Sequence, residues 1–379
     1  MRTTFGVVDG EPVQVVNRPR PLTLAVCDAR ALDEAKVRNL VAAEAARPFD
    51  LSNGPLLRAR LLRLGDGEHL LLLTAHHIIS DGWSTGVLIR EASALYRAFA
   101  AGLPSPLAEL PVQYADYAAW QRRWLQGDVL DAQLSYWRER LADPPPVLEL
   151  PTDRPRPAQP SNRSAGEPFT IPATLARALK ELSRAESVTL YMVLLAAFKA
   201  LLHRYTGATD ISVGTPIAGR TRTELEELIG FFVNTLVMRT SLAGDVTFRE
   251  LLARVRETAL GAYLHQDVPF ERLIEELRPA RSLNHTPFFQ TMFVLHNDVR
   301  DELDMPGLHT RTGGGASATA KFDLTLTLQE EADGSLSAHL NYNADLFDQS
   351  TVRRMAAHYE RLLRSRPPTP GRVSPPCRY

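Results

Sequence analysis

Eight prolines fall within the 26 residues from Asp143 to Pro168, and this stretch limits the possible folds more than any other feature of the chain. Proline fixes φ and has no backbone N–H, so the stretch cannot be a regular helix or a central strand. We interpret residues 151–168 as a connector between an N-terminal lobe, residues 1–150, and a C-terminal lobe, residues 169–363. Residues 364–379 contain five prolines and four arginines, and we predict a disordered tail there.

Helix and strand patterns alternate through both lobes. Two hairpins are expected, over residues 4–16 and 57–75. The apolar run Leu70–Leu73 is typical of a strand that is buried on both faces. Helices are expected at 33–47, 87–99, 116–141, 173–204 (one helix, or two separated near Ser187), 247–264, 270–277 and 351–363. Strands are expected at 211–216, 231–240, 291–297, 322–330 and 336–342. The predicted fold class is therefore α/β, or α+β, with two lobes.

Charge and cysteine content exclude several classes of protein. The 43 basic and 44 acidic residues give a net charge of -1, which offers no reason to expect nucleic acid or an anionic membrane as a partner. The two cysteines form neither a disulfide framework nor a C-x-x-C metal site. The richest apolar stretch, Met192–Leu202, is too short to span a bilayer. We predict a cytoplasmic protein with no metal site.

The sharpest local feature is the segment AHHIISDGWS, residues 75–84, where a predicted strand ends and a helix begins. Adjacent histidines on a strand point to opposite faces, which argues against a shared zinc ion. One imidazole, with an ordinary pKa of about 6.5, can therefore face a cavity and accept a proton near pH 7. Asp81 is placed to form a salt bridge or to cap the helix. Gly82 permits a positive φ or a close approach of a ligand to the backbone.

No protein nucleophile accompanies these histidines. The chain has no G-x-S-x-G elbow and no S-x-x-K, Walker or G-x-G-x-x-G motif. A histidine without a nucleophile favours direct transfer between two bound substrates. A packing role for the histidine pair, and a plain N-cap role for Asp81 or Ser84, remain alternatives on the residues alone.

The segment His76–Gly82, HHIISDG, resembles the HHxxxDG signature of the condensation domains of nonribosomal peptide synthetases. Five further segments resemble motifs of that family in the family's order. They are MRTTF at 1–5 (the end of RHExLRTxF), YADYAAW at 114–120 (YxDYAxW), IGFFVNT at 229–235 (IGxFVNT), HQDVPFE at 265–271 (HQDxPFE) and NHTPFFQ at 284–290. The resemblance therefore extends over residues 1–290.

This resemblance implies two chloramphenicol-acetyltransferase-like lobes that form a V with a central tunnel. It implies amide bond formation between a donor acyl or peptidyl thioester and an acceptor aminoacyl thioester. The implied partners are donor and acceptor peptidyl carrier proteins, whose phosphopantetheine arms hold the substrates, and an adjacent adenylation domain; the domain itself binds no cofactor. The alternatives are a related acyltransferase (ester formation, cyclisation, epimerisation or coenzyme A-dependent transfer) and a non-catalytic recruitment module. Residues 80–84 resemble the subtype that takes an L-configured donor.

The resemblance also implies roles for single residues. His77 faces the tunnel and is catalytic, together with Asp81 and Gly82. Structural support is implied for His76 and for Arg2, the remaining arginine of the RHExLRTxF segment and hence the expected partner of Asp81. Tunnel or substrate contacts are implied for Trp83, Ser84 and Asn234, although Asn234 could instead satisfy backbone groups at a strand crossing.

The family pattern begins before the first residue of this chain. The resemblance implies a preceding segment with a further strand and helix. The chain is therefore expected to be N-terminally truncated, with an uncovered apolar face on its first lobe.

Overall fold

The computed structural model describes residues 2–143, 147–158, 161, 163–279, 286–296, 303–311 and 319–365. The chain divides into two compact units. Unit 1 is Met1–Trp124, Arg220–Val233 and Arg300–Gly314, and unit 2 is Leu125–Gly219, Asn234–Val299 and Gly315–Tyr379. The first unit breaks off after Trp124 and not at the predicted residue 150, and two segments from the second half of the chain belong with it. The predicted tail from residue 366 onward, and the start of the NHTPFFQ segment, lie outside the described residues.

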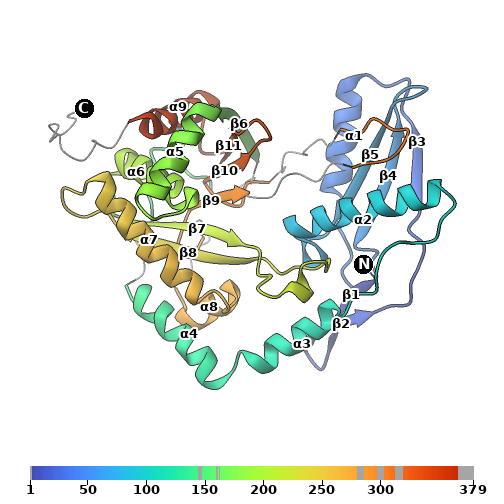
Figure 1. The fold of residues 1–379 in the computed structure, drawn as a ribbon, viewed down its shortest axis with the longest axis horizontal. Coiled ribbons are helices and arrows are strands. Elements are labelled where there is room, and N and C mark those ends of the chain that lie inside the picture. Colours follow the sequence, from blue (N-terminus) through green and yellow to red (C-terminus); the bar gives the residue numbers. More distant parts are fainter. Residues whose placement is uncertain are drawn as a thin grey trace. The chain divides into compact units, whose positions relative to one another are not determined.

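Unit 2 is built on a six-stranded sheet with the order β6-β11-β10-β9-β7-β8 (Figure 1). Its strands are β6 (Ser164–Ile171), β7 (Asp210–Ile217), β8 (Asn234–Ser241), β9 (Thr291–His296), β10 (Leu324–Glu330) and β11 (Leu336–Asn343). β9 pairs in parallel with β7 and β10, and the other neighbours are antiparallel. β6 starts inside the predicted connector and contains Pro168, which an edge strand tolerates.

The helices of unit 2 are α4 (Gly127–Arg140), α5 (Ala173–Ala185), α6 (Leu190–Thr206), α7 (Phe248–Leu264), α8 (Phe270–Leu277) and α9 (Gln349–Arg364). α6 is the central helix of the core and packs on α5, α7, α9 and β7. Thr189 caps its first turn, and Gly207 ends it in the left-handed conformation. Ser187, at φ 53°, separates α5 from α6, so the two-helix alternative is the observed one.

Unit 1 contains a small sheet and a separate hairpin. The hairpin is β1 (Thr3–Val8) and β2 (Glu11–Val16), and the sheet has the order β3 (Leu24–Asp28), β4 (Leu57–Arg63), β5 (His69–Ala75). Its helices are α1 (Glu34–Ala46), α2 (Gly82–Ala100), α3 (Tyr114–Trp124) and the short 3-10 turns η1 (His77–Ile79) and η2 (Thr223–Leu225). Both predicted hairpins are present, whereas β3 was not predicted.

The prediction that Leu70–Leu73 is buried on both faces is wrong. Leu71 and Leu73 are 39% and 46% exposed, and they alternate with less exposed neighbours along β5. The register aligns them, across β4, with Leu24 and Val26 of β3, which are also exposed. One face of this sheet is therefore apolar and open among the described residues.

Two predicted elements have different limits. The single helix expected at 116–141 is two helices, α3 and α4, because Gly127 takes a φ of 51° at the start of α4. The strand expected from Phe231 begins only at Asn234, because residues 231–233 belong to unit 1.

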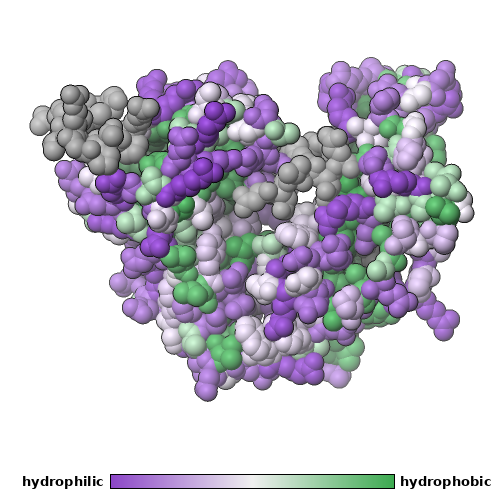
Figure 2. Space-filling model, viewed as in Figure 1, coloured by the Kyte–Doolittle hydropathy of each residue, from purple (hydrophilic) through white to green (hydrophobic). Residues whose placement is uncertain are grey.

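The outward residues of α5, such as Arg177, Glu181 and Arg184, are charged, and Figure 2 shows a hydrophilic surface over this helix. Within the described ranges, no single helix is both long enough and apolar enough to cross a bilayer. The pair α5 and α6 meets the length and composition criteria only jointly, with a bend of 104° between them.

Candidate active site

The HHIISDG segment lies in unit 1, between the end of β5 and the start of α2, as predicted. His76 is the N-cap of η1. Its Nδ1 accepts a hydrogen bond from the backbone N–H of Ile78 at 3.0 Å. Its ring lies edge-on to Phe49, with 5.9 Å between ring centroids. These contacts are those of a residue that supports the turn.

His77 has an exposed side chain whose two ring nitrogens are in different environments. Nδ1 lies 2.6 Å from the backbone carbonyl oxygen of Ser80. A carbonyl oxygen only accepts, so Nδ1 carries a proton, and in the neutral imidazole the lone pair is then on Nε2. Nε2 bonds to no atom of the described residues. Nε2 is therefore the ring atom available to an incoming group.

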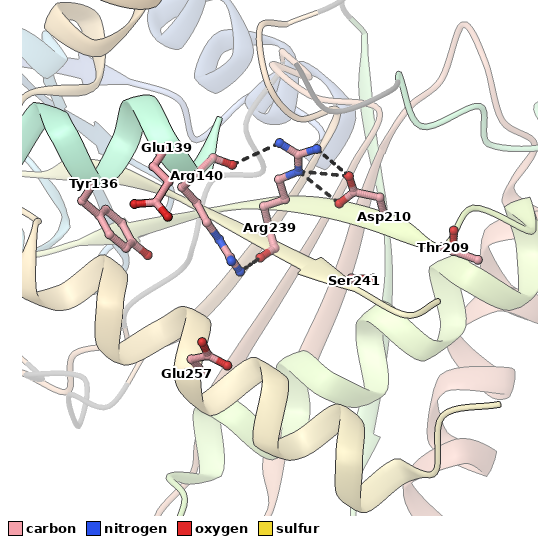
Figure 3. Close-up of a pocket in the computed structure, with 8 residues that line it drawn as sticks. All are labelled: Tyr136, Glu139, Arg140, Thr209, Asp210, Arg239, Ser241 and Glu257. Carbon is pink, nitrogen blue, oxygen red and sulfur yellow. Dashed lines mark hydrogen bonds and ion pairs between the residues drawn. The ribbon is translucent and has the colours of Figure 1, made fainter. Parts of the chain in front are cut away.

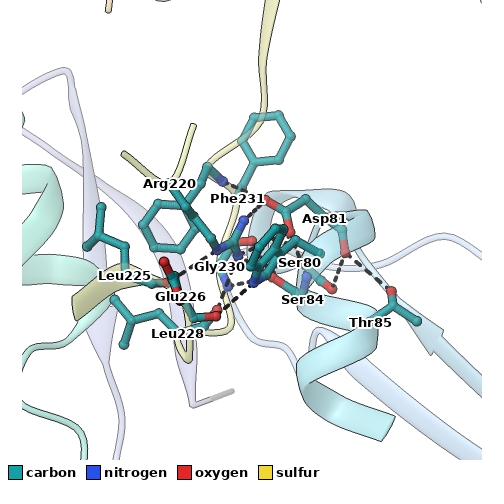
Figure 4. Close-up of polar contacts among 12 residues, drawn as sticks. Ser80, Asp81, Ser84, Thr85, Arg220, Leu225, Glu226, Leu228, Gly230 and Phe231 are labelled. Atoms are coloured by element: carbon teal, nitrogen blue, oxygen red, sulfur yellow. Dashed lines mark hydrogen bonds and ion pairs between the residues drawn. The ribbon is translucent and has the colours of Figure 1, made fainter. Parts of the chain in front are cut away.

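Asp81 is the centre of a buried polar network (Figure 4). Its carboxylate accepts hydrogen bonds from the backbone N–H and hydroxyl of Ser84 at 2.9 and 2.8 Å. It also accepts from the two terminal nitrogens of Arg220 at 2.9 and 3.2 Å, and from the N–H of Phe232 at 2.9 Å. Burial alone would raise the pKa of Asp81, but these donors and the Arg220 charge outweigh it and lower the pKa below its usual value.

The predicted pairing of Asp81 with Arg2 is wrong. The partner is Arg220, whose side chain is 1% exposed and faces an Asp81 side chain that is 3% exposed. Arg2 is exposed. Arg220 reaches Asp81 because the segment 220–233 belongs to unit 1 although it lies far along the sequence. Asp81 is enclosed by these partners, which fix the start of α2 relative to the segment 220–233.

Ser84 cannot contact a substrate, contrary to the prediction. Its side chain is fully buried, and its one hydroxyl proton is shared between the Asp81 carboxylate and the carbonyl of Gly230, each 2.8 Å away, while its oxygen accepts from the N–H of Gly230 at 3.0 Å. Trp83 is half-buried, and its indole N–H donates to the carbonyl of Glu226 at 2.8 Å. Both residues hold the segment 220–233 against the start of α2.

Gly82 is the first residue of α2 and does not take a positive φ, so that part of the prediction is wrong. A Cβ at Gly82 would meet nothing within 4 Å. The absence of a side chain leaves open space beside the first backbone N–H groups of the helix. Close approach of a ligand to this backbone is therefore sterically possible.

Asn234 has no capacity left for a substrate. Its amide nitrogen donates to the carbonyls of Gln266 and Val268, both at 2.8 Å. Its amide oxygen accepts from the N–H groups of Thr235 at 2.8 Å and Phe270 at 3.0 Å. The alternative prediction, that Asn234 satisfies backbone groups, describes these contacts.

Two residues of the site were missed in the sequence, Arg220 and Phe231. Arg220 also lies over the ring of Phe232, 4.2 Å from its centroid. The ring of Phe231 lies 4.8 Å from that of His77, at 76°. Tyr114 donates to the carbonyl of Phe231 at 2.8 Å, and burial raises the pKa of Tyr114 to about 12. The IGFFVNT motif indicated this segment, but no local pattern indicated what it contacts.

A cavity of about 470 Å³ lies in unit 2 and contains none of the predicted site residues (Figure 3). Its walls are charged and polar. Arg239 forms an ion pair with Asp210 at 2.7 Å, and Arg140 donates to the hydroxyl of Thr258 at 2.8 Å. No group of three or more potential ligands in the described ranges is placed to hold a metal ion.

The sequence matches the family described as "Condensation domain" over residues 1–366. It is 52% identical to one of the linear gramicidin synthase proteins of Brevibacillus parabrevis, over 96% of this chain and 5% of that protein. It is 44% identical to phosphinothricin tripeptide synthetase PhsC of Streptomyces viridochromogenes, over 98% of this chain and 34% of that protein. The chain thus spans a small part of the length of these synthetases.

The structure resembles the crystal structure of the X-domain from teicoplanin biosynthesis. The TM-score is 0.87 at 32% sequence identity, over 98% of this chain and 84% of that one. It also resembles the condensation domain from the monacolin K polyketide synthase MokA, with a TM-score of 0.82 at 25% identity, over 96% of this chain and 84% of that one.

Proposed function

The chain belongs to the condensation domain family of nonribosomal peptide synthetases, which are acyltransferases that form peptide bonds. From this premise we propose that the chain promotes amide bond formation through His77. Its mixed α/β structure is the chloramphenicol-acetyltransferase-like fold of that family. The observation that carries the proposal is the bond from His77 Nδ1 to the Ser80 carbonyl, which leaves Nε2 as a proton acceptor on an exposed ring.

The proposed substrates are a donor acyl or peptidyl thioester and an acceptor aminoacyl thioester. Each is held by the phosphopantetheine arm of a peptidyl carrier protein, and the adenylation domain next to this one loads the acceptor. The acceptor amine attacks the donor carbonyl carbon, and a C–N bond forms while Nε2 of His77 takes a proton from that nitrogen. The tetrahedral adduct then expels the donor thiolate as the C–S bond breaks. The imidazolium returns its proton to sulfur, and the products are the amide and a free thiol.

The required acceleration is modest because a thioester is already activated. Orientation of two bound reactants can supply about 7–11 kcal/mol of a barrier. A positioned base adds roughly 10²–10⁴-fold. We therefore assign most of the acceleration to placement of the two thioesters, and the smaller part to His77.

Gly82 is proposed to admit the donor carbonyl oxygen to the start of α2. The backbone N–H groups of Gly82 and Trp83 bond to nothing else in the described part of the chain. Such donors stabilise negative charge on an oxygen, and the positive end of the α2 dipole, which lies at the same N-terminus, adds to this effect. Asp81 holds the next N–H, that of Ser84, and so fixes the direction of this first turn.

The test is the turnover of His77→Ala with loaded donor and acceptor carrier proteins. We expect dipeptidyl-thioester formation to fall by about 10²-fold or more, with an unchanged circular dichroism spectrum and melting temperature. The matched control is His69→Ala, which removes an exposed histidine from the start of β5 and should keep full turnover. Equal turnover in the two variants would remove His77 from the mechanism.

The same assay separates the related activities. Donors on free coenzyme A that react as fast as carrier-bound donors would favour a coenzyme A-dependent acyltransferase. A hydroxyl acceptor that outcompetes the amine would favour ester formation. Binding of both carriers without any product would favour a recruitment module.

A cytoplasmic location remains a prediction.

A further inference from the structure

We propose that Phe231 is a positioning residue that holds the imidazole of His77 in one orientation and one tautomer. The proposal rests on the function proposed for His77. Its basis is the edge-to-face contact between the two rings, whose centroids are 4.8 Å apart at 76°. Phe231 occupies the open position of the IGxFVNT motif, so this aromatic contact is a feature of this chain.

Hydrogen bonds fix the backbone on both sides of Phe231 and so fix the position from which its ring extends to His77. The preceding residue, Gly230, bonds to the hydroxyl of Ser84 through both its N–H and its carbonyl. The carbonyl of Phe231 accepts from Tyr114 at 2.8 Å. The N–H of the next residue, Phe232, donates to Asp81 at 2.9 Å. The network of Asp81 therefore places the Phe231 ring as well as the turn.

Phe231 is not needed for the core of unit 1, because its neighbour serves that purpose. Phe232 is 4% exposed and packs with Leu225 and Leu228 in the small buried cluster, with Tyr114 against it. Phe231 is half-buried and stands outside that cluster. The Phe231 ring contacts an exposed imidazole and belongs to neither of the buried clusters. Its effect on that imidazole therefore explains its presence.

Phe231 is proposed to restrain the imidazole ring of His77. Besides the contact with Phe231, the orientation of this ring is fixed by one hydrogen bond, from Nδ1 to the carbonyl of Ser80. The second side-chain torsion of histidine is broad and roughly two-fold, and a flip would exchange Nδ1 for a carbon atom and lose that bond. A half-turn keeps the plane of the imidazole, so the edge-to-face contact with Phe231 acts on smaller rotations: turning the plane away would lose this contact and the Ser80 bond together. An aromatic pair changes the population of such a ring plane by about 2- to 12-fold. Phe231 therefore keeps Nε2, with its lone pair, in the orientation that meets the substrate.

The test is the tautomer of His77, measured by ¹⁵N NMR of the full chain labelled at histidine. The His77 signals are assigned by their loss in His77→Ala. In the unaltered chain we expect one tautomer with the proton on Nδ1. In Phe231→Leu we expect a mixture with the Nε2–H form, and in Phe231→Tyr a return to one form.

Turnover is measured on the same variants with carrier proteins loaded in turn with each common amino acid. We expect Phe231→Leu to lower kcat by about 2- to 12-fold with little change in the KM for the loaded acceptor, and Phe231→Tyr to restore it. The control is Phe99→Leu, which changes a phenylalanine of α2 that is 60% exposed, and it should change neither the His77 signals nor kcat.

Two results would overturn the proposal. One is a single, unchanged tautomer in Phe231→Leu. The other is a rise in KM with unchanged kcat, which would make Phe231 a substrate contact. If His77→Ala keeps full turnover, the proposed function fails, but the tautomer measurement still decides whether Phe231 restrains the ring.

Discussion

The replacement of Asp81 by Asn has a cost that can be worked out from the network it interrupts. Asn keeps the size of the side chain and can still accept from Ser84. It leaves the guanidinium of Arg220, whose side chain is 1% exposed, without its carboxylate. Removal of one partner of a buried ion pair costs about 3–5 kcal/mol, because the remaining charge stays buried. We expect Asp81→Asn to lower the free energy of unfolding of unit 1 by that amount.

The pH dependence of this loss has a defined sign. The pKa of Asp81 is lower in the folded chain than its unfolded value of about 3.9. The stabilisation by the carboxylate is therefore fully present above about pH 4 and is lost as the pH falls through the lower, folded pKa. The difference between the original chain and Asp81→Asn should accordingly be constant near neutral pH and shrink in acid.

Hydrogen exchange measured by mass spectrometry is the suitable assay, because it reports on unit 1 separately. Peptides that contain the N–H groups of Ser84, Gly230 and Phe232 should lose protection in Asp81→Asn. The matched control is Asp28→Asn, which removes an exposed ion pair with Arg30 and should leave these peptides unchanged.

A second variant checks the physical reason. The double substitution Asp81→Asn with Arg220→Met removes the buried guanidinium that has lost this carboxylate and should recover part of the lost protection. A loss below about 1 kcal/mol in Asp81→Asn, or a double variant less stable than Asp81→Asn, would contradict the argument that an uncompensated buried charge is responsible.

Three further outcomes follow from the packing. Gly230→Ala places a Cβ 2.3 Å from the ring of Tyr114 and should lower the free energy of unfolding by about 1–3 kcal/mol, measured in a thermal melt. The control is Gly82→Ala, where a Cβ meets nothing within 4 Å, and it should melt as the original chain does. Asn234→Ala leaves four backbone groups without partners and should lower stability by about 1–3 kcal/mol or more while the KM of the loaded acceptor stays unchanged. Burial lowers the pKa of Lys199 well below its usual value, so stability should rise with pH from that lowered value toward about 10.4. Urea titrations between pH 7 and 10 should show this rise, and Lys199→Met should abolish it.

Features encoded by neighbouring residues were predicted well. The turn at Asp9-Gly10, with both residues at positive φ, and the junction between β5 and α2 follow from short patterns in the sequence. The break between α3 and α4 was missed, since only the conformation of Gly127 marks it. The exposure of Leu71 was missed because a run of leucines does not reveal whether a second layer covers the sheet.

Features that depend on distant residues were not predictable in the same way. The partner of Asp81 lies 139 residues along the chain, and Ser84 bonds to a residue 146 positions away. Many arginines could have paired with Asp81, and the family resemblance indicated Arg2 because it is the arginine of the RHExLRTxF segment that this chain retains. Only the three-dimensional structure identifies Arg220 as the partner. The segment 220–233 connects two strands of the second unit, β7 and β8, but belongs to the first unit.

The same long-range contacts occupy the polar groups of Asp81 and Ser84. A neutral imidazole is useful only if its orientation and tautomer are fixed, and one carbonyl bond does not fix them alone. Asp81 uses its carboxylate to hold Arg220, the start of α2 and the N–H of Phe232 at once. The cost of burying the Asp81 carboxylate is offset by its five hydrogen-bond donors. One of these donors is the N–H of Phe232, and this bond helps to place the preceding ring, that of Phe231, beside His77. In the proposed mechanism the residues around the histidine act through its geometry, which determines the smaller, proton-transfer part of the acceleration.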